Sequence, residues 1–176
     1  PVPPPPTLLP MNISRPLWIV FSAALAGISA SAAPVSHWSF DSYKNGGWTL
    51  PHGQVQSAPG AKGGSLRMDG ESVIELKESA PLANDSFTLS LWFNPHDLSG
   101  GQQMVAGKNR YSLGERQWSL TIEPDGKLKA HLWQAGWVTI RCEHALLAGK
   151  WHWAALSVSR EKAVLFLDGE PVGETP

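Results

Sequence analysis

The sequence predicts an all-β protein from about residue 34 onward, folded as an antiparallel two-sheet β-sandwich. Two observations carry this prediction. Short β-branched and aromatic runs alternate with turn signals rich in Gly, Asn, Asp and Pro, at the spacing typical of sandwiches. No window of useful length has the apolar period of an amphipathic helix. The chain has 176 residues, which is enough for one domain with its own core.

The clearest strand signal lies at residues 87–94, where apolar and polar side chains alternate. Phe87, Leu89 and Leu91 share one face, whereas Trp92 lies on the other. Turn chemistry separates this strand from further short runs of the same kind. The expected strands are 87–94, 103–106, 118–123, 127–133, 137–142, 151–159 and 163–167.

The hairpin expected from residues 127–133 and 137–142 carries the candidate binding side chains. Its apolar residues alternate with residues of the opposite face, which are Lys129, His131, Trp133, Trp137, Thr139 and Arg141. The binding candidates among them are His131, Trp133, Trp137 and Arg141. Trp92 joins this set if its strand lies in the same sheet. Aromatic rings stack on sugar rings, and Arg and His donate hydrogen bonds to hydroxyl groups. The set is interpreted either as a glycan platform or as a surface covered by loops or a neighbouring domain.

The amino-acid composition excludes some classes of binding partner. The formal net charge is -1, and the charged residues are scattered, which argues against nucleic acid or an anionic membrane as a partner. The chain has nine tryptophans against two tyrosines, and tryptophan suits both cores and sugar platforms. Trp151 and Trp153 are assigned to core packing. The single cysteine, Cys142, excludes an intrachain disulfide and is interpreted as a small buried hydrophobe.

The first part of the chain is expected to lie outside the folded domain. Six of the first ten residues are proline, and residues 1–10 are interpreted as a Pro-rich extension that is not native. Residues 11–33 have the layout of a signal peptide, with Arg15, an apolar run at 17–28 and small residues before Pro34. The apolar run is short for a membrane span, although an uncleaved anchor is the alternative. We therefore expect a secreted, periplasmic or cell-surface protein with no membrane span after cleavage.

Five segments in this order resemble a laminin-G-like domain, a concanavalin A-like jelly roll. They are WSFD at 38–41, GSLRMDG at 64–70, SFTLSLWF at 86–93, GKWHWAAL at 149–156 and LFLDG at 165–169. The resemblance covers nearly all of residues 34–176 and implies an aromatic first strand at 38–41. Because such domains continue for several strands after the DG turn, it also implies a sandwich incomplete at its C-terminal end, with an unpaired sheet edge.

The resemblance implies a module that binds carbohydrate or an extracellular protein. Domains of this kind often hold calcium at a loop rim through oxygen ligands. The candidate calcium ligands here are Asp41, Asp69 and Asp168, which lie at the ends of strands. Each of them is equally explained as a turn-forming residue. No other cofactor is expected.

Catalysis by this chain is not expected. Laminarinase-type glycoside hydrolases of the same fold place three carboxylates on one strand face, in the pattern E-x-D-x-(x)-E. The nearest approach is Glu71 and Glu75, which have Val73 where the central acid belongs. We therefore predict a non-catalytic binding module. The alternative is an accessory domain of a larger secreted glycoside hydrolase or sulfatase, whose catalytic part lies beyond residue 176.

Overall fold

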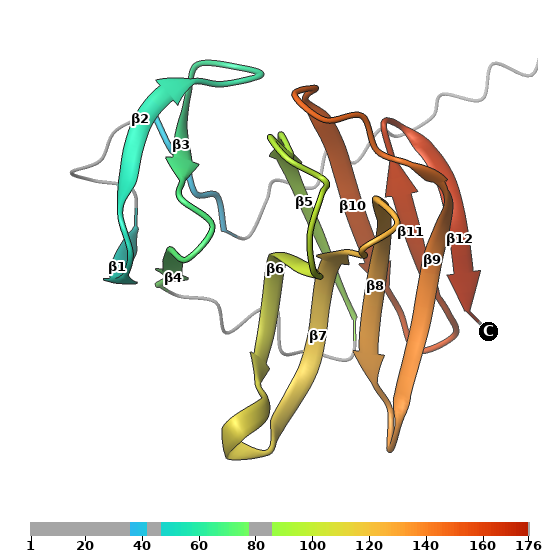
Figure 1. The fold of residues 1–176 in the computed structure, drawn as a ribbon. Coiled ribbons are helices and arrows are strands. Elements are labelled where there is room, and N and C mark those ends of the chain that lie inside the picture. The colour runs from blue at the N-terminus through green and yellow to red at the C-terminus, as the bar shows by residue number, and fades with distance from the viewer. Residues whose placement is uncertain (1–35, 42–46, 78–85, 176) are drawn as a thin grey trace, which may run out of the picture. The chain divides into compact units, whose positions relative to one another are not determined.

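The computed structural model describes residues 36–41, 47–77 and 86–175 (Figure 1). The Pro-rich extension expected at 1–10 and the signal peptide expected at 11–33 lie outside these described residues. The described part of the chain is built from strands, and it contains no helix with the length and apolar character needed to cross a membrane.

Residues 47–77 form two small antiparallel sheets of two strands each. β1 (Trp48–His52) pairs with β4 (Val73–Leu76), and β2 (Val55–Pro59) pairs with β3 (Gly64–Met68). The sequence signals did not predict β1 or β2. Each of these strands has only one β-branched residue, so their propensity for extended structure is weak.

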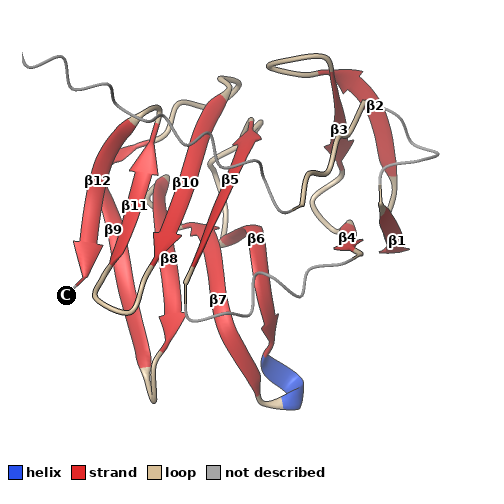
Figure 2. Cartoon of the chain, turned by 180° about the vertical axis from the view of Figure 1, so that it is seen from behind, coloured by secondary structure: helices blue, strands red, loops and turns tan. Residues whose placement is uncertain are grey.

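The remaining strands form two four-stranded antiparallel sheets, which Figures 1 and 2 show as two facing layers. One sheet has the order β12-β11-β10-β5, and the other has the order β6-β7-β8-β9. The strands of the first sheet are β5 (Phe87–Phe93), β10 (His152–Val158), β11 (Ala163–Leu167) and β12 (Glu170–Thr175). Those of the second are β6 (Gln103–Arg110), β7 (Glu115–Ile122), β8 (Lys127–Trp133) and β9 (Trp137–Ala145), with a 3-10 turn (Tyr111–Leu113) between β6 and β7.

The hydrophobic core lies between these two sheets, because every second side chain of their strands points inward. Leu120 and Leu128 of one sheet and Leu156 and Leu165 of the other are 0% exposed. They belong to one buried cluster that also contains Cys142. The cysteine is free and buried, which confirms its interpretation as a small core residue.

The predicted all-β sandwich is confirmed, and the strands expected between residues 87 and 167 are present within a few residues of their predicted bounds. The main difference in length is in β6, which runs to Arg110 instead of ending at Ala106. A β-bulge between Met104 and Ala106 changes the alternation on which the prediction rested.

The prediction of a strand at residues 38–41 was wrong. The Trp38 indole N–H donates to the Lys77 carbonyl at 3.1 Å, and the Asp41 carboxylate accepts from the Gly64 N–H. Such side-chain to backbone bonds take the place of a strand ladder.

The sequence also did not predict β12. Its Pro171 and Gly173 are both unfavourable inside a strand, yet β12 is an edge strand, where proline is tolerated. A Cβ placed on Gly173 would lie only 2.7 Å from Ile140 Cγ2, so glycine allows β12 to pack closely against β9.

Candidate functional site

β8 and β9 bring four of the five predicted binding residues onto one face of their sheet, and these are His131, Trp133, Trp137 and Arg141. The pairing register sets Trp133 directly opposite Trp137. A tight turn fixes this register, because the Gln134 N–H donates to the Gly136 carbonyl at 2.8 Å. Ala135 in the turn has a φ of 56°, in the left-handed region.

The two tryptophans form the exposed centre of this face. Each is 39% exposed, and their rings meet edge to face with centroids 5.3 Å apart. His131 also meets Trp137 edge to face, at 6.1 Å, and the Arg116 guanidinium lies 5.1 Å from the Trp133 ring centroid. These contacts hold the indoles in place, so a ligand that stacks on them does not have to immobilise them.

A polar network borders the tryptophan pair. Glu123, which follows β7, accepts hydrogen bonds through one carboxylate oxygen from Gln102 Nε2 (2.8 Å) and Thr121 Oγ1 (2.9 Å). Because the Thr121 hydroxyl donates its one proton to Glu123, it accepts from His131 Nε2–H, at 3.0 Å. Lys129 Nζ lies 3.8 Å from the other Glu123 oxygen. The network therefore fixes the tautomer and orientation of His131.

The network contains two groups whose pKa is lowered, Glu123 and His131. Burial opposes ionisation of Glu123, but the hydrogen bonds from Gln102 and Thr121 and the charge of Lys129 outweigh it, and the pKa of Glu123 is lowered. Burial, together with the Lys129 charge, lowers the pKa of His131, although Glu123 acts in the opposite direction. At neutral pH the site therefore presents an ionised carboxylate beside a neutral imidazole.

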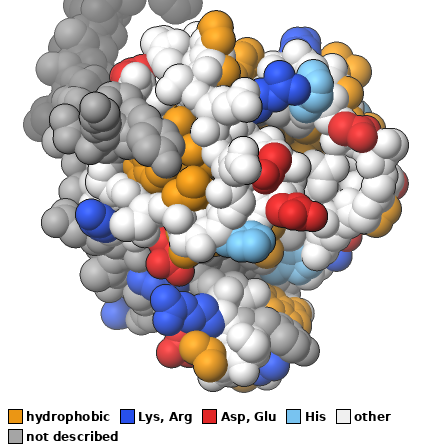
Figure 3. Space-filling view, turned by 60° about the vertical axis from the view of Figure 1, so that its left-hand side comes forward, with side chains coloured by type: hydrophobic (Ala, Val, Ile, Leu, Met, Phe, Trp, Pro, Cys, Tyr) orange, Lys and Arg blue, Asp and Glu red, His pale blue; other side chains and the backbone are white. Residues whose placement is uncertain are grey.

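The charges on this face occur in pairs of opposite sign. Arg141 forms an ion pair with Asp125 in the β7–β8 turn, and Lys127 Nζ lies 3.4 Å from a Glu143 oxygen. Figure 3 shows another view of the surface, in which acidic and basic side chains are also interspersed. These pairs contribute little net charge to the face, to which the Arg116 guanidinium beside Trp133 adds one positive charge.

The sequence analysis did not select Thr121, Glu123 or Lys129 as site residues. Alternation along β7 does place Thr121 on this face, where neighbouring side chains leave it only 2% exposed. The expected strand at 118–123 places Glu123 on the same face as Thr121, but its contact with Gln102 joins separate segments and is revealed only by the folded structure.

Trp92 was expected on this face if its strand lay in the same sheet, and that condition is not met. Its strand β5 pairs with β10, so Trp92 belongs to the other sheet and lies opposite Trp153. Trp151 and Trp153 were expected in the core, but both are only half-buried and lie outside the core cluster. Alternation explains this, because His152 between them points inward and is 5% exposed.

The candidate calcium ligands Asp41, Asp69 and Asp168 lie in separate turns, where each carboxylate accepts hydrogen bonds from backbone or side-chain donors. In the part of the chain that the structure describes, no three His, Cys, Asp or Glu side chains are grouped so as to hold a metal ion. Calcium binding stays a prediction.

The chain is similar to several solved structures. It is 21% identical to domain 4 of AbnA, a GH43 extracellular arabinanase from Geobacillus stearothermophilus solved in complex with arabinotriose, with a TM-score of 0.63 over 79% of this chain and 73% of that chain. An S-layer domain-containing protein from Clostridium thermocellum is 28% identical, with a TM-score of 0.47 over 81% of this chain and 67% of that chain. A heptameric SAP-like pentraxin from Limulus polyphemus is 18% identical, with a TM-score of 0.39 over 52% of this chain and 43% of that chain.

The arabinanase domain shares the sandwich fold with this chain, and at this identity the likeness concerns the fold alone. No curated protein matches the sequence. A family model, described as the concanavalin A-like lectin/glucanases superfamily, matches residues 68–176. Since this match covers more than half of the chain, the protein belongs to the concanavalin A-like lectin/glucanases superfamily.

Proposed function

We propose that this domain is a non-catalytic carbohydrate-binding module, and that it binds its glycan on the face of β8 and β9. The observation that carries the proposal is the exposed pair Trp133 and Trp137, held edge to face beside a polar network. Indole rings stack on the apolar faces of sugar rings. The neighbouring His131, Glu123 and Lys129 supply the donors and acceptors that sugar hydroxyls require.

The electrostatics of this face favour a neutral glycan. Arg141 is paired with Asp125, and Lys129 lies beside the ionised Glu123. An acidic polysaccharide would have to compete with these carboxylates for the same cations, whereas neutral hydroxyl groups can bond to both partners of each pair.

A structural relative adds support. The arabinanase domain that shares this fold was solved with arabinotriose, a neutral oligosaccharide. Arabinan fragments are therefore a reasonable first probe for this chain.

The carboxylates argue for binding rather than hydrolysis. Glycoside hydrolysis with two carboxyl groups needs them about 5–10 Å apart, and one of them must keep a proton to donate. Glu123 is surrounded by an amide, a hydroxyl, an imidazole and an ammonium group, and its lowered pKa makes it a poor proton donor. Glu75 lies in β4 of another sheet and Glu71 lies before that strand; both are exposed, with Val73 between them.

We propose that the module acts outside the cytoplasm, either as an adhesion module or as an accessory domain that brings an exported enzyme to its polysaccharide. The signal-peptide layout at 11–33 supports export. The arabinanase domain supports the second setting, since it is one domain of an extracellular enzyme. Reading the gene beyond residue 176 separates the two, because only the second setting requires a catalytic signature.

The direct test is isothermal titration of the full chain with arabinan oligosaccharides and a panel of other neutral oligosaccharides. We expect Trp133→Ala and Trp137→Ala each to weaken binding at least about tenfold. Trp133→Phe keeps an aromatic ring and should retain most of the affinity. Leu147→Ala is the matched control, because it truncates a 58% exposed side chain outside this face. Unchanged binding in both alanine variants would remove this face from the proposal.

A further inference from the structure

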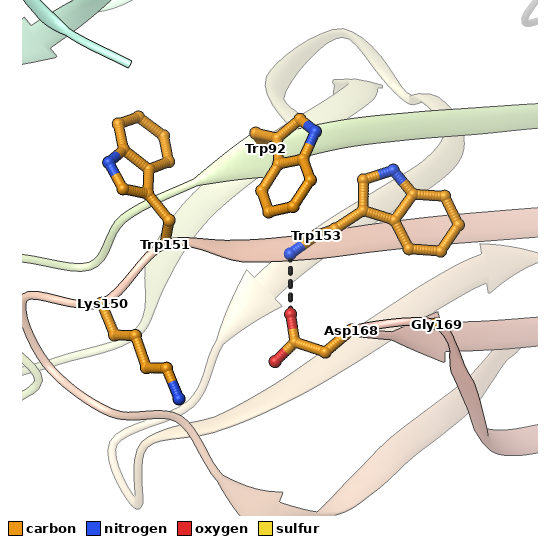
Figure 4. A pocket seen from close by; sticks show the side chains of 6 residues that line it. All are labelled: Trp92, Lys150, Trp151, Trp153, Asp168 and Gly169. Carbon is orange, nitrogen blue, oxygen red and sulfur yellow. Dashed lines mark hydrogen bonds between the residues drawn. The ribbon is translucent and has the colours of Figure 1, made fainter. Parts of the chain in front are cut away.

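The outer face of the other sheet carries a second group of tryptophans. Trp151 directly precedes β10, and Trp153 within β10 is the cross-strand partner of Trp92. The three indoles line an open hollow of about 480 Å³. Its remaining lining residues are Lys150, Asp168 and Gly169 (Figure 4). This volume falls within the range of small-ligand pockets, about 300–1,000 Å³.

The tryptophan rings are available to a ligand. Trp92 is 46% exposed, and Figure 4 shows its ring between those of Trp151 and Trp153. None of the three indole N–H groups donates a hydrogen bond to another residue in the described part of the chain. A buried structural tryptophan usually has such a partner. These rings therefore offer both stacking surface and hydrogen-bond donors.

The hydrogen-bond acceptor in the hollow is the Asp168 carboxylate, which its own hydrogen bonds hold in place. One Asp168 oxygen accepts from the backbone N–H of Trp153 at 2.9 Å, and the other lies 2.8 Å from His152 Nδ1. The Asp168 side chain is nevertheless 48% exposed. Each carboxylate oxygen can accept a second hydrogen bond, so Asp168 can bond to a ligand without releasing His152.

Lys150 and Asp168 give the lining one positive and one negative charge, and in Figure 4 the Lys150 side chain extends on the side of the rings where Asp168 lies. A charged ligand would gain from one of these groups and be repelled by the other. A polyhydroxylated neutral ligand can instead accept from Lys150 and donate to Asp168.

We propose that this hollow is a second carbohydrate-binding site, which takes a neutral sugar ring. Trp92 and Trp153 stack on the ring, and Lys150 and Asp168 bond to its hydroxyl groups. The site is separate from the β8–β9 face, because the two lie on different sheets. A module with two such sites can hold a polysaccharide at two points, which raises its avidity.

The test is a titration of the ¹⁵N-labelled full chain with neutral hexaoses (arabino-, cello-, manno- and xylohexaose), followed by NMR of the indole N–H groups. With at least one of these sugars we expect the signals of Trp92, Trp151 and Trp153 to shift. In the double variant Trp133→Ala/Trp137→Ala these shifts should persist, even if the β8–β9 face binds nothing. Trp92→Ala should weaken the sugar affinity measured from the Trp153 signal at least about tenfold. Trp92→Phe should retain most of that affinity.

Three outcomes overturn the proposal. The first is that no neutral hexaose moves the signals of Trp92, Trp151 or Trp153 at millimolar concentration. The second is that polygalacturonate moves them while the neutral sugars do not, which would assign the hollow to an acidic glycan. The third is that dilution of the protein alone moves them, which would make the hollow a contact between copies of the chain. None of these results depends on whether Trp133 and Trp137 bind sugar.

Discussion

His152 Nδ1 lies 2.8 Å from a carboxylate oxygen of Asp168, which joins a buried imidazole to the rim of the tryptophan hollow. The Leu147 N–H lies 3.2 Å from the other ring nitrogen of His152 and donates to it. The contact of Nε2 with the Leu147 N–H leaves Nδ1 to donate to the Asp168 carboxylate. This chain of bonds links the loop after β9, the start of β10 and the β11–β12 turn.

Replacing Asp168 by asparagine tests the charge in this chain of bonds. Burial opposes ionisation of Asp168, but the hydrogen bonds from His152 and Trp153 outweigh it and lower its pKa. A lowered carboxyl pKa contributes stability that is present above the unfolded value of about 3.9 and is lost as the pH falls through the folded value. Asparagine tolerates the φ of 52° at this position. We expect Asp168→Asn to cost about 1 kcal/mol at neutral pH, a small loss because the side chain is half exposed.

Urea unfolding of both proteins at neutral pH and near the unfolded aspartate pKa checks this prediction. The difference between wild type and Asp168→Asn should shrink as the pH falls below about 4. A difference that is independent of pH would show that the charge of Asp168 is not its cause.

Neutralising Glu123 should lower the pKa of His131 further. In the fold, burial and the Lys129 charge lower this pKa, and Glu123 counteracts them. Glu123→Gln removes the counteracting charge, so His131 should protonate at a lower pH than in wild type. NMR titration of the imidazole signals measures the change. Glu143→Gln is the control, since its carboxylate pairs with Lys127 and should leave His131 unaffected. An increase in the His131 pKa in Glu123→Gln would contradict the network described for this face.

Gly173→Ala should destabilise the sandwich through a single contact. The added methyl group would lie 2.7 Å from Ile140 Cγ2, so β12 must move away from β9. The expected cost is about 1–3 kcal/mol in the free energy of unfolding. Gly101→Ala is a matched control, because a Cβ at that position meets nothing within 4 Å. Combining Gly173→Ala with Ile140→Ala should cost less than the sum of the single changes, because the smaller side chain makes room for the methyl group.

Leu120→Ala tests the position of the core. Leu120 is 0% exposed in the cluster between the two sheets, and its truncation should cost about 2–5 kcal/mol. Leu113→Ala removes the same atoms from a 66% exposed side chain and should change stability by less than about 0.5 kcal/mol. Thermal or denaturant unfolding of the two variants measures both effects. Equal losses would place Leu120 outside the core.

The sequence predicted those strands in which apolar and polar side chains alternate. Residues 87–94 and 127–133 were recognised because their apolar side chains recur at every second position and face one core. Residues 38–41 have the aromatic content of a strand, but the carboxylate of Asp41 bonds to the Gly64 backbone instead. β12 was missed because its proline and glycine are tolerated only at a sheet edge, and sequence patterns do not reveal which strand is at the edge.

For the candidate site, too, the sequence predicted what depends on local pairing and missed what depends on tertiary contacts. A turn of three residues makes the pairing of Trp133 and Trp137 a local property, so the sequence could place both on one face. The position of Trp92 depends on which strand β5 pairs with, and that choice is made between segments about sixty residues apart. Glu123 joins His131 only through tertiary contacts, which no spacing rule describes.

The face that carries Trp133 and Trp137 depends on the register set by the β8–β9 turn. Side chains alternate with a period of two, so a shift of one residue in the pairing of β9 would exchange its two faces. Trp137 and Arg141 would then enter the core, and Ile140 and Cys142 would face water. An insertion or deletion between Trp133 and Trp137 therefore preserves this surface only if a change of loop length or a bulge absorbs it and the strand register is kept.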